Sequence, residues 1–167
     1  MTAFVTVFEI TRWSNGLLAD ELFRFLVGAV ALIGAIATLL FKWRRSGAFP
    51  WRHLIPSLFT MVWAVIWLAM HDFPRVLQRI DDLVEAYETG RYEVSEGPVT
   101  VLHEQPAHGH SSGDRIVVGG KTFEVNYFYA TPAYQQTIAH GGVLHAGTYA
   151  RLSHVNGEIV RVEIRER

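Results

Sequence analysis

Two long runs without a charged residue constrain the fold of this chain more than any other feature. They extend over residues 25–41 and 54–70, and each contains 17 residues. A helix of that length spans about 25 Å, close to the bilayer hydrocarbon thickness of about 30 Å. Neighbouring residues bring each run near the usual length of about 20. The sequence therefore predicts two transmembrane helices, at about 22–42 and 53–72, in a membrane domain of residues 1–73.

Small side chains recur along the first predicted helix at spacings of three and four residues. They are Gly28, Ala31, Ala35 and Thr38. Residues at these spacings share one helix face, and small residues there let a second helix approach closely. The partner helix is either the second one of this chain or one from another subunit, and the sequence leaves both open.

The link between the two runs is basic, which predicts the orientation in the membrane. It carries Lys42, Arg44, Arg45 and Arg52. Short loops rich in Lys and Arg stay in the cytoplasm. We therefore expect a two-pass protein of the bacterial inner membrane with both termini outside the cytoplasm, in the periplasm of a Gram-negative cell.

Residues 1–20 lack the ordered parts of a cleaved signal peptide, namely a basic start, an apolar stretch and a small-residue cleavage site. Several apolar residues between Phe4 and Ile10 suit a short strand or an interfacial segment. We favour an amphipathic segment that leads into the first membrane helix.

Residues 74–90 predict a short amphipathic helix. Its apolar residues are spaced by three and four: Val76, Leu77, Ile80, Leu83, Val84 and Tyr87. Pro74 suits its first turn and Gly90 its end. Its charges are of both signs, so strong binding to anionic lipid is not expected.

From residue 91 onward the pattern changes to short β-strands. Gly119-Gly120 and Asn156-Gly157 predict two hairpins, because such pairs favour the tight turns between antiparallel strands. The first strand is expected to be long and bent at Gly97-Pro98. We expect residues 91–167 to form a soluble five-stranded antiparallel β-barrel of the OB or SH3-like kind, since closure removes exposed edges. The fold class is thus an α+β membrane protein.

One long connection between the predicted strands carries the candidate binding residues. Its aromatic, hydroxyl, amide and glycine residues suit contact with a ligand or partner: Tyr129, Thr131, Tyr134, Gln135, His140, Gly141 and Gly142. The two glycines would allow a pair of exposed N–H groups to hold an anion. The alternative is a structural crossover in which Tyr134 and Ile138 cover one end of the barrel.

Histidines raise the question of metals and pigments. One loop carries His103, Glu104, His108 and His110, of which His108 and His110 could share one side of an extended backbone. A polar loop explains the same residues, and no HExxH-type helix is present, so we predict no metal. His53 and His71 flank the second predicted helix near water, where they need no haem or pigment.

Catalytic signals are absent from the sequence. Without cysteine there is no thiolate chemistry, and no nucleophile elbow, phosphate-binding loop, dinucleotide fingerprint or carboxylate pair is apparent. A net charge of −1 argues against general electrostatic binding of nucleic acid. We expect a protein that is no enzyme and takes no cofactor.

The second half of the chain resembles an uncharacterised bacterial family of small membrane proteins. The resemblance rests on a GxYEVxEGxV start, a VxGKxFxVxY hairpin, an HGG triplet and an NGEIVRVEI close, with Gly90, Tyr92, Gly97, Phe123, Tyr127, His140, Gly141, Gly142, Gly147 and residues 156–164 as matching positions. Members of the family carry membrane helices followed by a small β-rich domain. The resemblance implies that architecture and brings no substrate with it.

Three functions are compatible with these observations. The first is a non-catalytic membrane-anchored binding or assembly protein, whose partners are the lipid bilayer and other membrane subunits or further copies of itself. The second is an accessory subunit of a larger integral-membrane complex. The third is a ligand-gated membrane effector, because the architecture is similar to the membrane-anchored β-barrel effectors of bacterial anti-phage systems, in which a nucleotide signal drives assembly of the helices. That function requires a cytoplasmic β domain, against the charge pattern.

Overall fold

The protein divides into two compact units. The computed structural model describes residues 3–47, 51–70, 73–108 and 111–166. One unit consists of residues 18–77 and is called the helical unit; the other combines residues 1–17 with 78–167 and is called the β unit. Residues 1–17, which the sequence analysis assigned to the membrane domain, belong to the β unit in this division.

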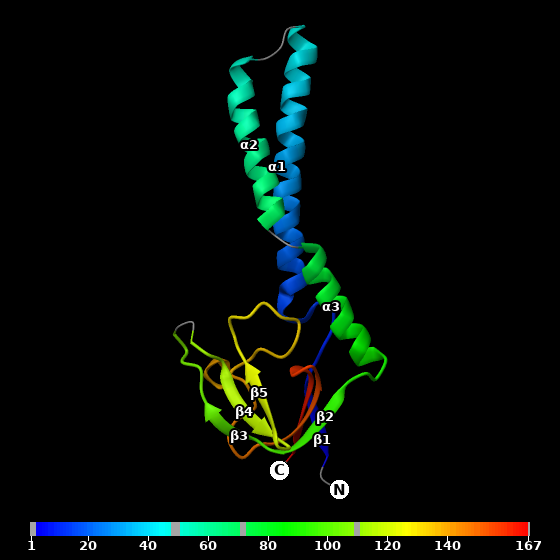
Figure 1. Ribbon diagram of the computed structural model, residues 1–167, viewed down its shortest axis with the longest axis vertical. Helices are drawn as coiled ribbons and strands as arrows, with labels where there is room; N and C mark the ends of the chain where they lie inside the picture. The colour runs from blue at the N-terminus through cyan, green and yellow to red at the C-terminus, as the bar shows by residue number, and fades with distance from the viewer. Residues whose placement is uncertain (1–2, 48–50, 71–72, 109–110, 167) are drawn as a thin grey trace. The chain divides into compact units, whose positions relative to one another are not determined.

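The helical unit is built from two long helices, α1 (Leu17–Ser46) and α2 (Trp51–Met70), drawn in blue to green in Figure 1. Both are long and apolar enough to cross a membrane, as the two charge-free runs predict. The first is longer than predicted at both ends. Pro56 is the sixth residue of α2 and lies beyond its first turn, and the helix continues through it.

Small side chains lie between α1 and α2. Gly28, Ala35, Ser57 and Ala64 are all buried. A Cβ atom added to Gly28 would come within 2.8 Å of the Leu68 side chain. The predicted small-residue face of α1 is therefore occupied, at this point, by α2 of the same chain.

The β unit contains two antiparallel sheets. The first has the strand order β1-β7-β6-β2, with bounds β1 (Phe4–Glu9), β7 (Glu158–Arg165), β6 (Tyr149–Val155) and β2 (Glu93–Pro98). The second has the order β3-β4-β5, with bounds β3 (Thr100–His103), β4 (Asp114–Val118) and β5 (Lys121–Val125). Neither sheet closes into a barrel among the strands that the structure describes, so the predicted closed five-stranded barrel is wrong.

Two features of the chain explain why two sheets form instead. The predicted long first strand bends after Pro98, and its two halves, β2 and β3, join different sheets. The N-terminal segment adds a strand that was not counted, since β1 pairs with β7 in a register that sets Val5 opposite Ile164. The sequence allowed either a short strand or an amphipathic segment leading into the membrane at residues 4–10. The structure has the strand, so the favoured amphipathic segment is wrong.

Both predicted hairpins are confirmed. In the β4–β5 hairpin Val118 pairs with Lys121, and in the β6–β7 hairpin Val155 pairs with Glu158. Asn156 and Gly157 adopt φ values of +50° and +87°, the pattern of a tight two-residue turn that few side chains tolerate.

Residues from both sheets form one core. The cluster consists of Val99, Ile116, Val118, Phe123, Val125, Tyr134, Leu144, Ala150, Leu152, Ile159 and Val162. The predicted amphipathic helix is present as α3 (Phe73–Glu88), whose buried residues are Ile80, Leu83, Val84 and Ala86. The Tyr87 hydroxyl donates to a Glu9 carboxylate oxygen at 2.6 Å, which links α3 to the end of β1.

Candidate functional site

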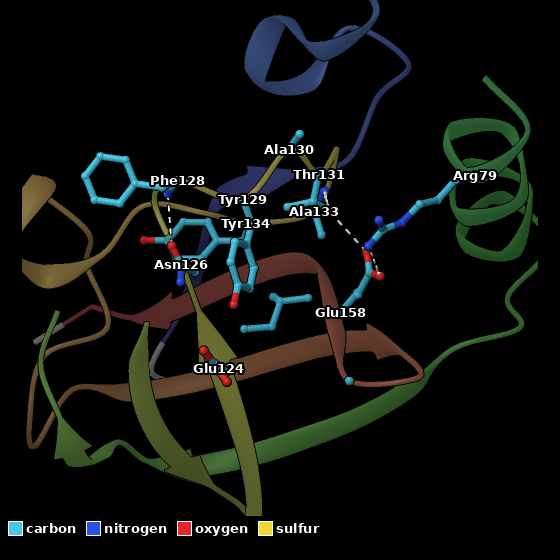
Figure 2. Close-up of a pocket in the computed structure, with 12 residues that line it drawn as sticks. Arg79, Glu124, Asn126, Phe128, Tyr129, Ala130, Thr131, Ala133, Tyr134 and Glu158 are labelled. Atoms are coloured by element: carbon cyan, nitrogen blue, oxygen red, sulfur yellow. Dashed lines mark hydrogen bonds and ion pairs between the residues drawn. The ribbon is translucent and has the colours of Figure 1, made fainter. Parts of the chain in front are cut away.

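A pocket of about 420 Å³ lies in the β unit, beside the connection that follows β5. It is lined by Arg79, Glu124, Asn126, Phe128, Tyr129, Ala130, Thr131, Ala133, Tyr134, Gly157, Glu158 and Ile159 (Figure 2). Three of the seven predicted binding residues, Tyr129, Thr131 and Tyr134, are among them. The pocket thus brings together α3, the β5–β6 connection and the turn before β7.

An ion pair forms one polar side of the pocket. The Arg79 Nη2 atom lies 2.6 Å from a Glu158 carboxylate oxygen, and the Thr131 hydroxyl donates to the other oxygen of that carboxylate at 3.1 Å (Figure 2). Both charged side chains are partly exposed. Because both side chains still contact solvent, a ligand can hydrogen-bond to them without first having to bind two charges that are completely removed from water.

Tyr134 forms the fixed floor of the pocket. It is 5% exposed, its N–H donates to the Ile159 carbonyl at 2.8 Å, and its hydroxyl accepts from the Val143 N–H at 3.1 Å. The Phe8 ring meets it edge-on. Burial raises the pKa of the Tyr134 phenol above its ordinary value. Tyr134 thus holds the β5–β6 connection in place and also lines the pocket, and a binding role for it stays a prediction.

Three buried polar side chains hold the loops around the pocket. The Asn126 Oδ1 atom accepts from Gln105 Nε2 and from the Phe128 N–H, both at 3.0 Å. The Asp114 carboxylate accepts from the Gln105 N–H at 2.7 Å and from the Ile138 N–H at 2.6 Å. All three side chains are therefore hydrogen-bonded, which offsets the cost of burying them.

Asn15 fixes the same connection from the N-terminal side. Its Nδ2 atom donates to the carbonyls of Thr131 and Ala133, at 2.9 Å and 2.7 Å. The residue has a φ of +58°, a left-handed conformation that asparagine tolerates better than most residues. The segment that precedes α1 is thereby attached to the pocket loop.

The remaining predicted binding residues lie away from the pocket lining. Gly141 and Gly142 donate their N–H groups to the carbonyls of Ile138 and Thr137, so these groups are not presented to an anion as predicted. His140 stacks on the Tyr127 ring with centroids 3.7 Å apart. Gln135 is half-buried and does not line the pocket.

The histidine loop brings no metal ligands together in the described part of the chain. No group of three His, Cys, Asp or Glu side chains among the described residues could hold a metal ion. His103, Glu104 and His108 are exposed, whereas His71 and His110 lie outside the described residues.

Sequence reasoning missed several of the pocket residues. Arg79, Glu124, Asn126, Phe128 and Glu158 come from α3, β5, the following connection and β7. The signal that could have drawn attention to one of them is the position of Asn126 between a strand and an aromatic run. The others are charged residues of ordinary helix and strand patterns, and only long-range folding places them together.

The chain was compared with known proteins at three levels. No family model, no curated protein and no solved structure matches the chain. The fold and the pocket define a two-unit α+β protein with two antiparallel sheets and two helices long and apolar enough to cross a membrane.

Proposed function

We propose that this protein is a non-catalytic membrane-anchored binding protein. In this proposal α1 and α2 cross the bacterial inner membrane as a hairpin, and the β unit presents its pocket at the membrane surface. The basic link at Lys42, Arg44 and Arg45 supports a cytoplasmic turn between the helices and an external β unit.

The observation that carries the membrane part is the outward apolar surface of the helices. Large side chains are exposed along both helices, including Val30, Ile33, Ile36, Leu40, Phe41, Leu58, Phe59, Val62, Val65 and Ile66. Only 11% and 12% of the two most apolar stretches are buried. Leaving one such side chain in water rather than in an apolar environment costs about 1.5–3 kcal/mol, which a surrounding bilayer removes.

The pocket supports the binding part of the proposal. Its volume falls within the range of about 300–1,000 Å³ that is typical of small-molecule sites. It combines aromatic surface from Phe128 and Tyr129 with the polar group formed by Arg79, Thr131 and Glu158. Such a mixture suits a ligand, or a short segment of a partner, that has both an apolar part and a hydrogen-bonding part.

Photo-crosslinking in cells tests the binding role. A photoreactive amino acid at Glu124, an exposed residue of the pocket lining, is expected to yield a specific adduct. The matched control is the same amino acid at Thr122, which is exposed on the same strand but does not line the pocket. Equal adduct patterns at the two positions would count against a binding role for the pocket.

The side of the membrane is tested by paired reporters fused after the C-terminus, one active only in the cytoplasm and one only outside. We expect activity of the external reporter. Activity of the cytoplasmic reporter would contradict the orientation and favour the ligand-gated effector, whereas a periplasmic β unit rules that effector out.

A second candidate function, an accessory subunit of a larger membrane complex, is favoured by a groove on the helical unit. The groove has a volume of about 460 Å³ and is lined by Val30, Ala31, Gly34, Ala35, Thr38, Pro56, Ser57 and Thr60. A Cβ added at Gly34 would meet no atom within 4 Å, so a side chain of another helix has room there. Purification in mild detergent separates the candidates, because a stable co-purifying complex supports the subunit and a lone protein contradicts it.

A further inference from the structure

Exposed aromatic side chains of the β unit gather in two short segments. Tyr127, Phe128 and Tyr129 follow one another directly after β5 and are 42%, 40% and 61% exposed; Trp13 is 63% exposed. In the part of the β unit that the structure describes, these four are the aromatic residues with large exposure. Exposed aromatic rings that gather in this way mark a binding surface. Tyr and Trp rings suit a partner that offers both apolar contact and hydrogen bonds.

Hydrogen bonds bring the two segments to the same place. Asn15, two residues after Trp13, donates to the carbonyls of Thr131 and Ala133, at 2.9 Å and 2.7 Å. The aromatic run ends two residues before Thr131. The edge of the β unit that carries these rings is thus the edge where the chain leaves for α1, which begins at Leu17.

The length of chain between this edge and the apolar part of α1 is short. Leu17 to Glu21 are five helical residues, about 7.5 Å long at 1.5 Å per residue. One headgroup layer of a bilayer is about 5–7 Å thick. The Arg24 side chain turns back to the Glu21 carboxylate at 2.9 Å, as expected of a basic residue at the end of a membrane span. The length of the covalent link therefore allows the aromatic edge to reach the headgroups.

We propose that Trp13 and Tyr127–Tyr129 form an interfacial surface that lies in the headgroup layer of the bilayer and binds lipid there. This inference rests on the proposed function, since it requires α1 and α2 to cross the membrane. Tyr and Trp favour this layer because their rings are apolar and their hydroxyl and N–H groups find polar partners.

The charges around the surface are balanced, so the binding depends on the rings rather than on anionic lipid. Arg12 pairs with Asp81 at 3.1 Å, and Arg79 pairs with Glu158 at 2.6 Å. Vesicles of zwitterionic phosphatidylcholine are therefore the appropriate test membrane.

The absence of cysteine from the chain allows a direct measurement. Single-cysteine variants of the full-length protein carry a nitroxide label in phosphatidylcholine vesicles, with and without a small fraction of nickel-chelating lipid. The test variants are Tyr129→Cys and Trp13→Cys. The matched control is Thr122→Cys, exposed near the opposite end of β5, and the reference is Val30→Cys, exposed in the middle of the apolar run of α1.

The proposal predicts that headgroup nickel increases relaxation of the labels at positions 129 and 13 several-fold more than at position 122. The reference label at position 30 should behave as in hydrocarbon, which means that oxygen reaches it and a soluble nickel chelate does not. If it does so, and relaxation at positions 129 and 13 is no greater than at position 122, the proposal is overturned. If the position-30 label is instead reached by the soluble chelate, the membrane-spanning function fails, and this inference fails with it. Burial against protein alone would give no response to nickel lipid, which also overturns the proposal.

Discussion

The helical unit and the β unit use apolar residues in opposite ways. Between α1 and α2 the buried residues are small, such as Gly28, Ala35 and Ala64, and the large ones face outward. In the β unit large residues such as Phe123 and Leu152 are buried inside. The proposed membrane location of the helical unit predicts this inversion, because lipid tails accept large apolar side chains, whereas water drives such side chains into the core of the β unit.

Polar groups differ between the units in the same sense. In the helical unit two hydroxyls bond to their own helix: Thr38 donates to the Gly34 carbonyl at 2.8 Å and Thr60 to the Pro56 carbonyl at 2.9 Å. The Trp67 Nε1 atom of α2 donates to the Arg24 carbonyl of α1 at 3.0 Å. The β unit instead joins distant segments, as when Asp114 accepts from the Ile138 N–H. A hydrogen bond within one helix gives a hydroxyl a partner where water is not available. Hydrogen bonds between distant segments instead fix how loops pack against one another.

The largest expected effect comes from breaking the long-range network of the β unit. Asp114→Ala removes a buried carboxylate and leaves the N–H groups of Gln105 and Ile138 without their partner. We expect a loss of at least about 3 kcal/mol of β-unit stability, because each bond to a charged acceptor contributes about 1.5–3 kcal/mol. Hydrogen exchange of the β4 and β5 amides in the detergent-solubilised protein measures this. The exposed Glu104→Ala is the control, and equal exchange in both variants would contradict the role of the network.

The inverted packing of the helical unit is tested by enlarging a buried glycine. Gly28→Leu places atoms where Leu68 and Trp67 already lie, 2.8 Å and 3.0 Å from the added Cβ. Overpacking of this kind costs about 1–3 kcal/mol. We expect a longer distance between spin labels at the exposed residues Ile33 and Val62.

Gly34→Leu is the matched control, since nothing lies within 4 Å of a Cβ at this position. The label distance should stay unchanged in this variant. If both variants lengthen the distance equally, close approach at Gly28 is not what holds the two helices together.

A smaller effect is expected from the turn between β6 and β7. Gly157→Val forces a β-branched residue to a φ of +87°. We expect a loss of about 1–2 kcal/mol, the typical cost of a left-handed conformation for such a side chain. Thermal melting followed in the near-ultraviolet tyrosine signal measures it, and Gly157→Asn should lose less, because asparagine tolerates positive φ. Equal melting of wild type and Gly157→Val would refute the strain argument.

The smallest effect is a pH dependence located at His154. This side chain is buried, its Nε2 lies 3.1 Å from the Ser95 hydroxyl, and burial together with the nearby Lys121 charge lowers its pKa against the opposing charge of Glu93. The unfolded chain, with a histidine pKa of about 6.5, then binds a proton that the folded chain rejects. Stability of the β unit should therefore be complete above about pH 6.5 and fall as the pH decreases towards the lowered folded pKa.

Melting between pH 7.5 and pH 5.5 tests this behaviour in a window above the ordinary carboxylate titrations. His154→Gln should flatten the profile in that window, because the amide does not titrate. An unchanged slope in this variant would assign the pH dependence to another group.

The parts of the fold that the sequence predicted correctly are those with a local signal. The apolar runs of α1 and α2, the three- and four-residue spacing in α3, and the turns at Gly119-Gly120 and Asn156-Gly157 are all seen in the structure. The closed barrel was wrong, because closure depends on which strands become neighbours. The candidate site was predicted in part: Tyr129, Thr131 and Tyr134 line the pocket, whereas Gly141 and Gly142 use their N–H groups within their own turn.

The sequence by itself determined the length and apolar character of the helices, the amphipathic face of α3 and the positions of the tight turns. These features depend on hydrogen bonds and φ preferences within a few residues, so they can be recognised without the rest of the chain. Only the tertiary structure decided that residues 4–9 pair with β7, that β2 and β3 enter different sheets, and that Arg79 meets Glu158 beside Thr131. These contacts join residues far apart in the sequence, and they form only where the packing of the whole β unit repays the entropy of bringing the segments together.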